Sequence, residues 1–247
     1  MKPAPSPDPE SPYTPRWIPS QFKGARKNAR REYTIDDYSL GEVIANSVSN
    51  GVGAALAIAA LVILIVRAVM HGAGVHLLVA LVFGIPMVLA FLMSTLYHAL
   101  QADTAKLVFR VLGHDFVLLF IAGAFTPYCV LALDSSTGVT TSMVVLGIVW
   151  LMALAGVLIE SIWHARPRWI PIALCACMCC MGLALVPDLY AALPGPAWWL
   201  LVAAVVCFVA GLVLYLFRRV PYLWFVSHLF VLGGSVCLFL SVVVFVI

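Results

Sequence analysis

Charged residues are scarce in this sequence. Only 10% of its 247 residues are Asp, Glu, Lys or Arg, whereas 64% are hydrophobic. A soluble globular domain carries about 25% charged residues, so the composition excludes that class of protein. The apolar residues also form long runs without an amphipathic period, which is typical of membrane spans.

The long apolar runs have the length of membrane-spanning helices, which need about 20 residues. Seven such runs occur, at 45–66, 77–97, 112–133, 142–163, 169–187, 197–217 and 223–246. They lack the strict alternation over about 10 residues that marks a transmembrane β-strand. The sequence therefore predicts an all-α polytopic membrane protein, with a seven-transmembrane-helix bundle formed by residues 33–247.

The first 32 residues have a different composition. Seven of the first 20 residues are proline, and six basic residues follow from Arg16 to Arg31. A segment this poor in apolar residues cannot bury a core. We predict a disordered, Pro-rich, basic cytoplasmic tail at 1–32. Its basic half serves as a topology signal or is attracted to anionic lipid.

Basic residues are almost missing from one set of connecting segments. Of the 14 Lys and Arg residues, 13 lie in the tail or in 98–111, 164–168 and 218–222, and only Arg67 lies elsewhere. Cytoplasmic segments of membrane proteins carry the excess of Lys and Arg. The charges therefore predict a cytoplasmic N-terminus and an external C-terminus.

Local zinc motifs are also missing, because the sequence contains neither HExxH nor a pair of CxxC motifs. Polar residues instead gather at the predicted cytoplasmic ends of four spans, and polar groups inside a bilayer are functional candidates. They are Glu42, Asn46, Ser49, Asn50, Ser94, His98, His114, Asp115, Trp224, Ser227 and His228. Imidazoles and a carboxylate at similar depth suit a zinc ion. Hydrogen-bonded packing between helices is the alternative.

Five segments along the chain carry a family resemblance. In order they read GEVIANSVSNGVGA, STLYHAL, IAGAFTP, GIVWLMALAGV and HLFVLGGS. They resemble the bacterial hemolysin III-like proteins, also called PAQR family membrane homeostasis proteins, which are relatives of the adiponectin and progestin receptors. The resemblance runs from about Glu42 to the C-terminus. It implies a seven-helix, multi-pass protein of the bacterial inner membrane, with membrane lipids as partners. No nucleic-acid partner is expected, and no protein partner is indicated.

The resemblance also implies a zinc site near the cytoplasmic leaflet. The family pattern uses the His of an S-x3-H motif, both His of an H-x3-H motif, and an Asp. Ser94 and His98 match the first motif, and His228 matches the second His of the other. Trp224 stands in place of the remaining His, and Gly113 stands in place of the Asp. The site is therefore partly degenerate, and two carried-over histidines are too few for a tight zinc site.

A third zinc ligand would come from His114 or Asp115. The candidate metal ligands are accordingly His98, His228 and His114, and the candidate catalytic residues are Ser94 and Asp115. Ser94 would orient the metal-bound water or the substrate carbonyl, and Asp115 would act as a general base or as a ligand.

Three functions are compatible with these features, and the sequence leaves open whether the protein is an enzyme. The first is a non-enzymatic role in membrane lipid or energetics homeostasis, as the family name implies. The second is a zinc-dependent lipid amide hydrolase, by analogy with the alkaline ceramidases of the wider superfamily. The third is a pore-forming hemolysin. It is the least favoured, because a water-filled path needs polar residues along whole helices.

Overall fold

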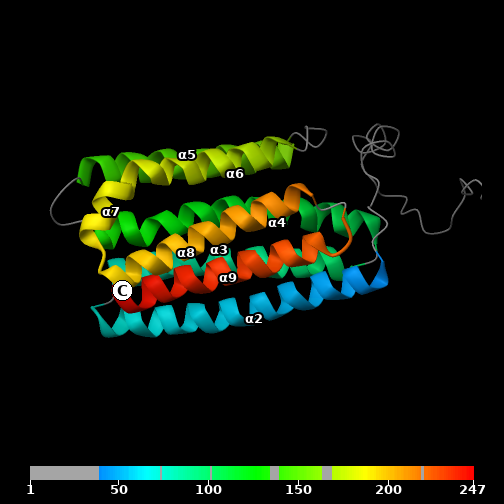
Figure 1. The fold of residues 1–247 in the computed structure, drawn as a ribbon, viewed down its shortest axis with the longest axis horizontal. Coiled ribbons are helices and arrows are strands. Elements are labelled where there is room, and N and C mark those ends of the chain that lie inside the picture. The colour runs from blue at the N-terminus through cyan, green and yellow to red at the C-terminus, as the bar shows by residue number, and fades with distance from the viewer. Residues whose placement is uncertain (1–38, 73, 101, 134–138, 163–168, 218–219) are drawn as a thin grey trace, which may run out of the picture. The chain divides into compact units, whose positions relative to one another are not determined.

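The computed structural model describes residues 39–72, 74–100, 102–133, 139–162, 169–217 and 220–247. The predicted tail, 1–32, lies outside the described residues. All regular elements within them are helices (Figure 1). Seven helical stretches of this part of the chain are long and apolar enough to cross a membrane. The prediction of an all-α bundle with seven spans is thereby confirmed, whereas the orientation of its termini stays a prediction.

The helices follow one another with short connections and pack mainly against their neighbours. Their bounds are α2 Leu40–Met70, α3 Val75–Ala99, α4 Asp103–Pro127, η1 Tyr128–Ala132, α5 Val139–Ile162, α6 Trp169–Met181, η2 Gly182–Leu185, α7 Val186–Ala192, α8 Gly195–Leu216 and α9 Leu223–Phe245. Helix α2 packs against α3, α3 against α4, α4 against α5, and α8 against α9. Helix α2 also packs against α9, so the first and last spans lie side by side (Figure 1).

Two spans are interrupted near prolines. The fifth span, predicted as 169–187, continues to Ala192 through the 3₁₀ turn η2 and the short helix α7. Pro187 has no backbone N–H, and its ring disfavours a regular helix over the preceding turn, which is where η2 lies. Pro127 is likewise followed by the single π-helical turn η1. Membrane helices tolerate such breaks because neighbouring groups satisfy the released backbone atoms.

The core is built from aromatic and small residues on the middle helices. Phe120 on α4 stacks on Phe83 of α3, with ring centroids 6.0 Å apart. Its ring also packs edge to face against that of Phe208 of α8, with ring centroids 6.3 Å apart. The opposite faces of the helices expose large apolar side chains, such as Leu151 and Val62. In a bilayer these faces meet lipid, so the bundle has an apolar exterior as well as an apolar core.

Gly123 permits the close approach of α4 to α3. A Cβ atom added at Gly123 would lie 2.5 Å from the backbone carbonyl oxygen of Val82. Backbone cannot yield as a flexible side chain can, so Gly123→Ala must push the two helices apart. We expect the variant to lose about 2 kcal/mol of unfolding free energy, measured as a lower midpoint of thermal unfolding in detergent. Gly147→Ala is the matched control, because its added Cβ meets nothing within 4 Å. An unchanged midpoint in Gly123→Ala would contradict the packing.

Candidate functional site

The polar residues singled out from the sequence lie at one end of the bundle. This is the end where α2 and α9 begin and α3 ends, on the right of Figure 1, and it is called the polar end below. Helix α2 begins there with a capping box. The Ser39 hydroxyl oxygen accepts a hydrogen bond from the backbone N–H of Glu42 at 3.3 Å. The Glu42 carboxylate accepts from the Ser39 backbone N–H at 3.0 Å and from its hydroxyl at 2.9 Å. The box explains why α2 starts at Leu40 rather than at residue 45.

The Glu42 carboxylate also holds the start of α9. Its second oxygen accepts a hydrogen bond from the backbone N–H of Tyr222 at 2.8 Å. Tyr222 is the N-cap of α9 and has a left-handed backbone, with φ of 60°. A carboxylate at a helix start is favourable because the N–H groups there have no partners within the helix. One buried carboxylate therefore joins the beginnings of two helices that are 180 residues apart in the sequence.

Asn46 connects α2 to a histidine on α9. Its side-chain NH₂ donates to the carbonyl oxygen of Glu42 at 2.9 Å, so its amide oxygen faces Nδ1 of His228 at 3.0 Å. Because an amide oxygen can only accept, Nδ1 of His228 must carry the hydrogen and donate. In a neutral imidazole the lone pair then lies on Nε2. The Asn46 side chain thus sets both the tautomer and the ring orientation of His228.

His98 and His228, which the sequence places at similar depth, are neighbours in the fold. Their ring centroids are 5.4 Å apart and the rings meet edge to face. The side chain of His98 is only 5% exposed. Its Nε2 atom makes no hydrogen bond with any of the described residues. Ser94, the other residue of the S-x3-H motif, lies one helical turn before His98 on α3.

Trp224 packs against both histidines. Its ring centroid lies 4.8 Å from that of His98 and 6.0 Å from that of His228. His228 follows Trp224 by one helical turn on α9. The ring centroids of Tyr97 and Tyr215 each lie 6.0 Å from that of Trp224. Five aromatic rings from α3, α8 and α9 are therefore packed together at the polar end. The indole can donate through its N–H but offers no lone pair to a metal.

His114 and Asp115 lie on α4, next to a different helix. Nδ1 of His114 is 3.3 Å from a carboxylate oxygen of Glu160, near the end of α5. Sequence reasoning did not anticipate this contact, because no local pattern relates residues 46 positions apart. The neighbouring Asp115 is buried. The structure therefore joins His114 to α5, whereas the pair of His98 and His228 lies between α3 and α9.

The donors at the polar end fall short of a zinc site. Zinc in proteins is held by three or four protein ligands. Among the described residues no group of three or more His, Cys, Asp or Glu side chains could hold a metal ion. The pair of His98 and His228 supplies two imidazoles, and the indole of Trp224 fills the neighbouring position on α9. The described residues at the polar end thus do not supply the full set of ligands for the zinc site that the resemblance implies.

Comparisons with known proteins agree with the sequence motifs and the bundle. The family model described as "Haemolysin-III related" matches residues 40–240. The chain is 34% identical over 209 residues to Hemolysin-3 of Bacillus cereus, and the aligned region covers 83% of this chain and 92% of that protein. It is 31% identical over 205 residues to the Hemolysin-3 homolog of Bacillus subtilis strain 168, and the aligned region covers 83% of this chain and 94% of that homolog. No solved structure matches the chain. With a family match over most of its length and seven spans, this chain belongs to the haemolysin-III related family of integral membrane proteins.

Proposed function

We propose that this protein acts in membrane lipid or energetics homeostasis without catalysing a reaction. The proposal places the polar end in the cytoplasmic leaflet of a bacterial inner membrane, as the distribution of basic residues predicts. Its partners are then the lipids around the bundle. The process is the one that the resemblance to the PAQR family membrane homeostasis proteins implies, and the chemistry at the polar end supports the absence of catalysis.

The observation that carries the proposal is how the buried polar groups are used. Both carboxylate oxygens of Glu42 accept hydrogen bonds from the starts of helices, and Asn46 bonds His228. These contacts join α2 to α9 and leave neither Glu42 nor Asn46 for a substrate. Polar groups buried between membrane helices hold the helices in register. A bundle joined this way at one end can respond as a unit when the thickness or packing of the lipid changes.

Removing both imidazoles tests this proposal. In a strain that lacks the gene, His98→Ala/His228→Ala is expected to restore membrane order and membrane potential to within about twofold of wild type. The reason is that neither ring touches a substrate in a non-catalytic protein. The bond from Tyr222 to Glu42 still joins α2 to α9 when the bond from His228 to Asn46 is lost. Membrane order is measured by the anisotropy of a lipid probe, and potential by a voltage-sensitive dye. His71→Ala/His76→Ala is the matched control, because it removes two imidazoles at the opposite end of the bundle. Loss of rescue by the first variant alone, at normal expression, would contradict the proposal.

A zinc-dependent lipid amide hydrolase is the second candidate. One observation favours it: Nε2 of His98 is buried without a hydrogen bond from the described residues, beside the imidazole of His228. In this function Ser94 and Asp115 would be the catalytic candidates, and a metal would have to recruit a further ligand such as His114. Release of fatty acid from ceramide by the purified protein, abolished by a chelator, would support this candidate over the first.

A further inference from the structure

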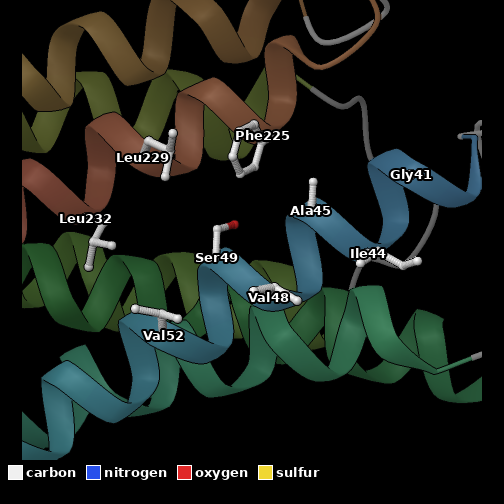
Figure 2. Close-up of a pocket in the computed structure, with 9 residues that line it drawn as sticks. All are labelled: Gly41, Ile44, Ala45, Val48, Ser49, Val52, Phe225, Leu229 and Leu232. Carbon is white, nitrogen blue, oxygen red and sulfur yellow. The ribbon is translucent and has the colours of Figure 1, made fainter.

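A groove runs along the outside of the bundle between α2 and α9. Figure 2 shows Ala45 and Ser49 of α2 and Phe225 and Leu229 of α9 directed into the space between the two helices. The lining residues are Gly41, Ile44, Ala45, Val48, Ser49 and Val52 on α2 and Phe225, Leu229 and Leu232 on α9. The groove has a volume of about 460 Å³. Its lining is almost entirely apolar and includes the partly exposed side chains of Val48 and Leu229, so it is open to the surroundings of the bundle.

The groove has the length of one lipid leaflet. From Gly41 to Val52 the axis of α2 rises by about 16 Å, at 1.5 Å per residue. Half of the hydrocarbon core of a bilayer is about 15 Å. The groove starts in the first turn of α2, at the polar end. It therefore runs from the surface of the leaflet at the polar end to Val52, about 5 Å short of the middle of the span predicted at 45–66.

The groove lies on a face of the bundle that meets lipid in a bilayer, because the exposed side chains along it are apolar. An unbranched hydrocarbon chain is apolar along its length and surrounds the bundle at high concentration. The lining requires no polar partner, because the Ser49 hydroxyl already donates to the carbonyl oxygen of Asn46 at 3.1 Å.

We propose that this groove binds one acyl chain of a phospholipid from the leaflet at the polar end. The chain would lie against the same helical turns that carry the α2–α9 contacts. Ala45, which lines the groove on α2, directly precedes Asn46. Leu229, which lines it on α9, directly follows His228. A chain that fits keeps the two helices at the spacing that the bond from His228 to Asn46 requires. This inference rests on the proposed function, since it names the part of the lipid that the protein would bind and respond to.

Filling the groove tests the inference. Ser49→Phe places a ring midway along the groove, where Figure 2 shows the Ser49 side chain between the two helices. Ala59→Phe is the matched control, because Ala59 is exposed on the same helix outside the groove. Native mass spectrometry of protein released from vesicles of phosphatidylethanolamine and phosphatidylglycerol counts the phospholipids that stay bound. We expect wild type and Ala59→Phe to retain one phospholipid that Ser49→Phe loses. Equal retention by the two phenylalanine variants would overturn the inference.

A second measurement needs no variant and so does not depend on folding. Wild type is reconstituted with a phospholipid that carries a photoreactive group midway along one acyl chain. We expect cross-links concentrated on the peptides that contain Val48, Ser49 and Leu229. An even spread over all lipid-facing positions, such as Val62 and Leu151, would overturn the inference. Because both experiments measure binding alone, they can fail while the genetic rescue test succeeds, and the reverse also holds.

Discussion

Replacing Trp224 with histidine is expected to produce a protein that binds one Zn²⁺ per chain, whereas the wild type binds less than a tenth of that. The substitution removes the indole that packs against both histidines and places a third imidazole one helical turn before His228. Together with His98 it completes the three protein ligands that an open zinc site uses. We expect a dissociation constant below about 1 μM, equivalent to more than about 8 kcal/mol of binding free energy.

Metal content is measured by mass spectrometry after dialysis of the detergent-purified protein against buffered Zn²⁺. Trp169→His is the matched control, because Trp169 is exposed at the start of α6, whereas the pair of His98 and His228 packs on Trp224. The double variant Trp224→His/His98→Ala should lose the ion again. The loss of the packed indole should lower the thermal midpoint of apo Trp224→His, and Zn²⁺ should raise it again. One zinc per chain in wild type would refute the view that Trp224 closes the site.

Replacing Glu42 with alanine is expected to cost about 3 kcal/mol of unfolding free energy, the largest loss from any single change at the polar end. The substitution removes the acceptor for the backbone N–H of Tyr222 and for both donors of Ser39. A hydrogen bond to a charged group contributes about 1.5–3 kcal/mol, and a helix cap contributes about 1 kcal/mol. The contributions overlap, so their sum is an upper limit. The thermal midpoint should fall by about 6–12 °C for a chain of this size.

Two further variants make the Glu42 result specific. Glu42→Gln keeps an acceptor oxygen but not the charge, so its loss should be intermediate. Asp188→Ala removes a carboxylate from the first turn of α7, at the opposite end of the bundle, and should change the midpoint by less than about 2 °C. Hydrogen exchange should locate the effect, with faster exchange at the beginnings of α2 and α9 in Glu42→Ala. A midpoint within about 2 °C of wild type in Glu42→Ala would show that the carboxylate does not join the two helices.

The seven spans could be predicted because each is a property of one helix in a bilayer. Length and hydropathy mark a span without reference to any neighbour. The same reasoning placed His98 and His228 at one depth, because each lies near the end of its span. The ends of the spans were less predictable. The capping box of Ser39 extends α2 beyond the apolar run, and Pro187 divides the fifth span into α6, η2 and α7.

The identity of the neighbours at the polar end could be decided only by the tertiary structure. The sequence places His98, His114 and His228 at similar depth, and nothing in their spacing says which of them meet. Packing brings His98 to His228 and joins His114 to Glu160 on α5. It also places Trp224 against the histidine pair.

The sequence by itself thus determined the class of protein, its seven spans and the depth of its polar groups, because hydropathy and length act within one segment at a time. The tertiary structure decided that Glu42 joins α2 to α9, that Asn46 orients His228, and that a groove remains between those two helices. Each of these features depends on how far apart two helices lie and how they are rotated. Both quantities follow from side-chain packing between segments that are up to 182 residues apart.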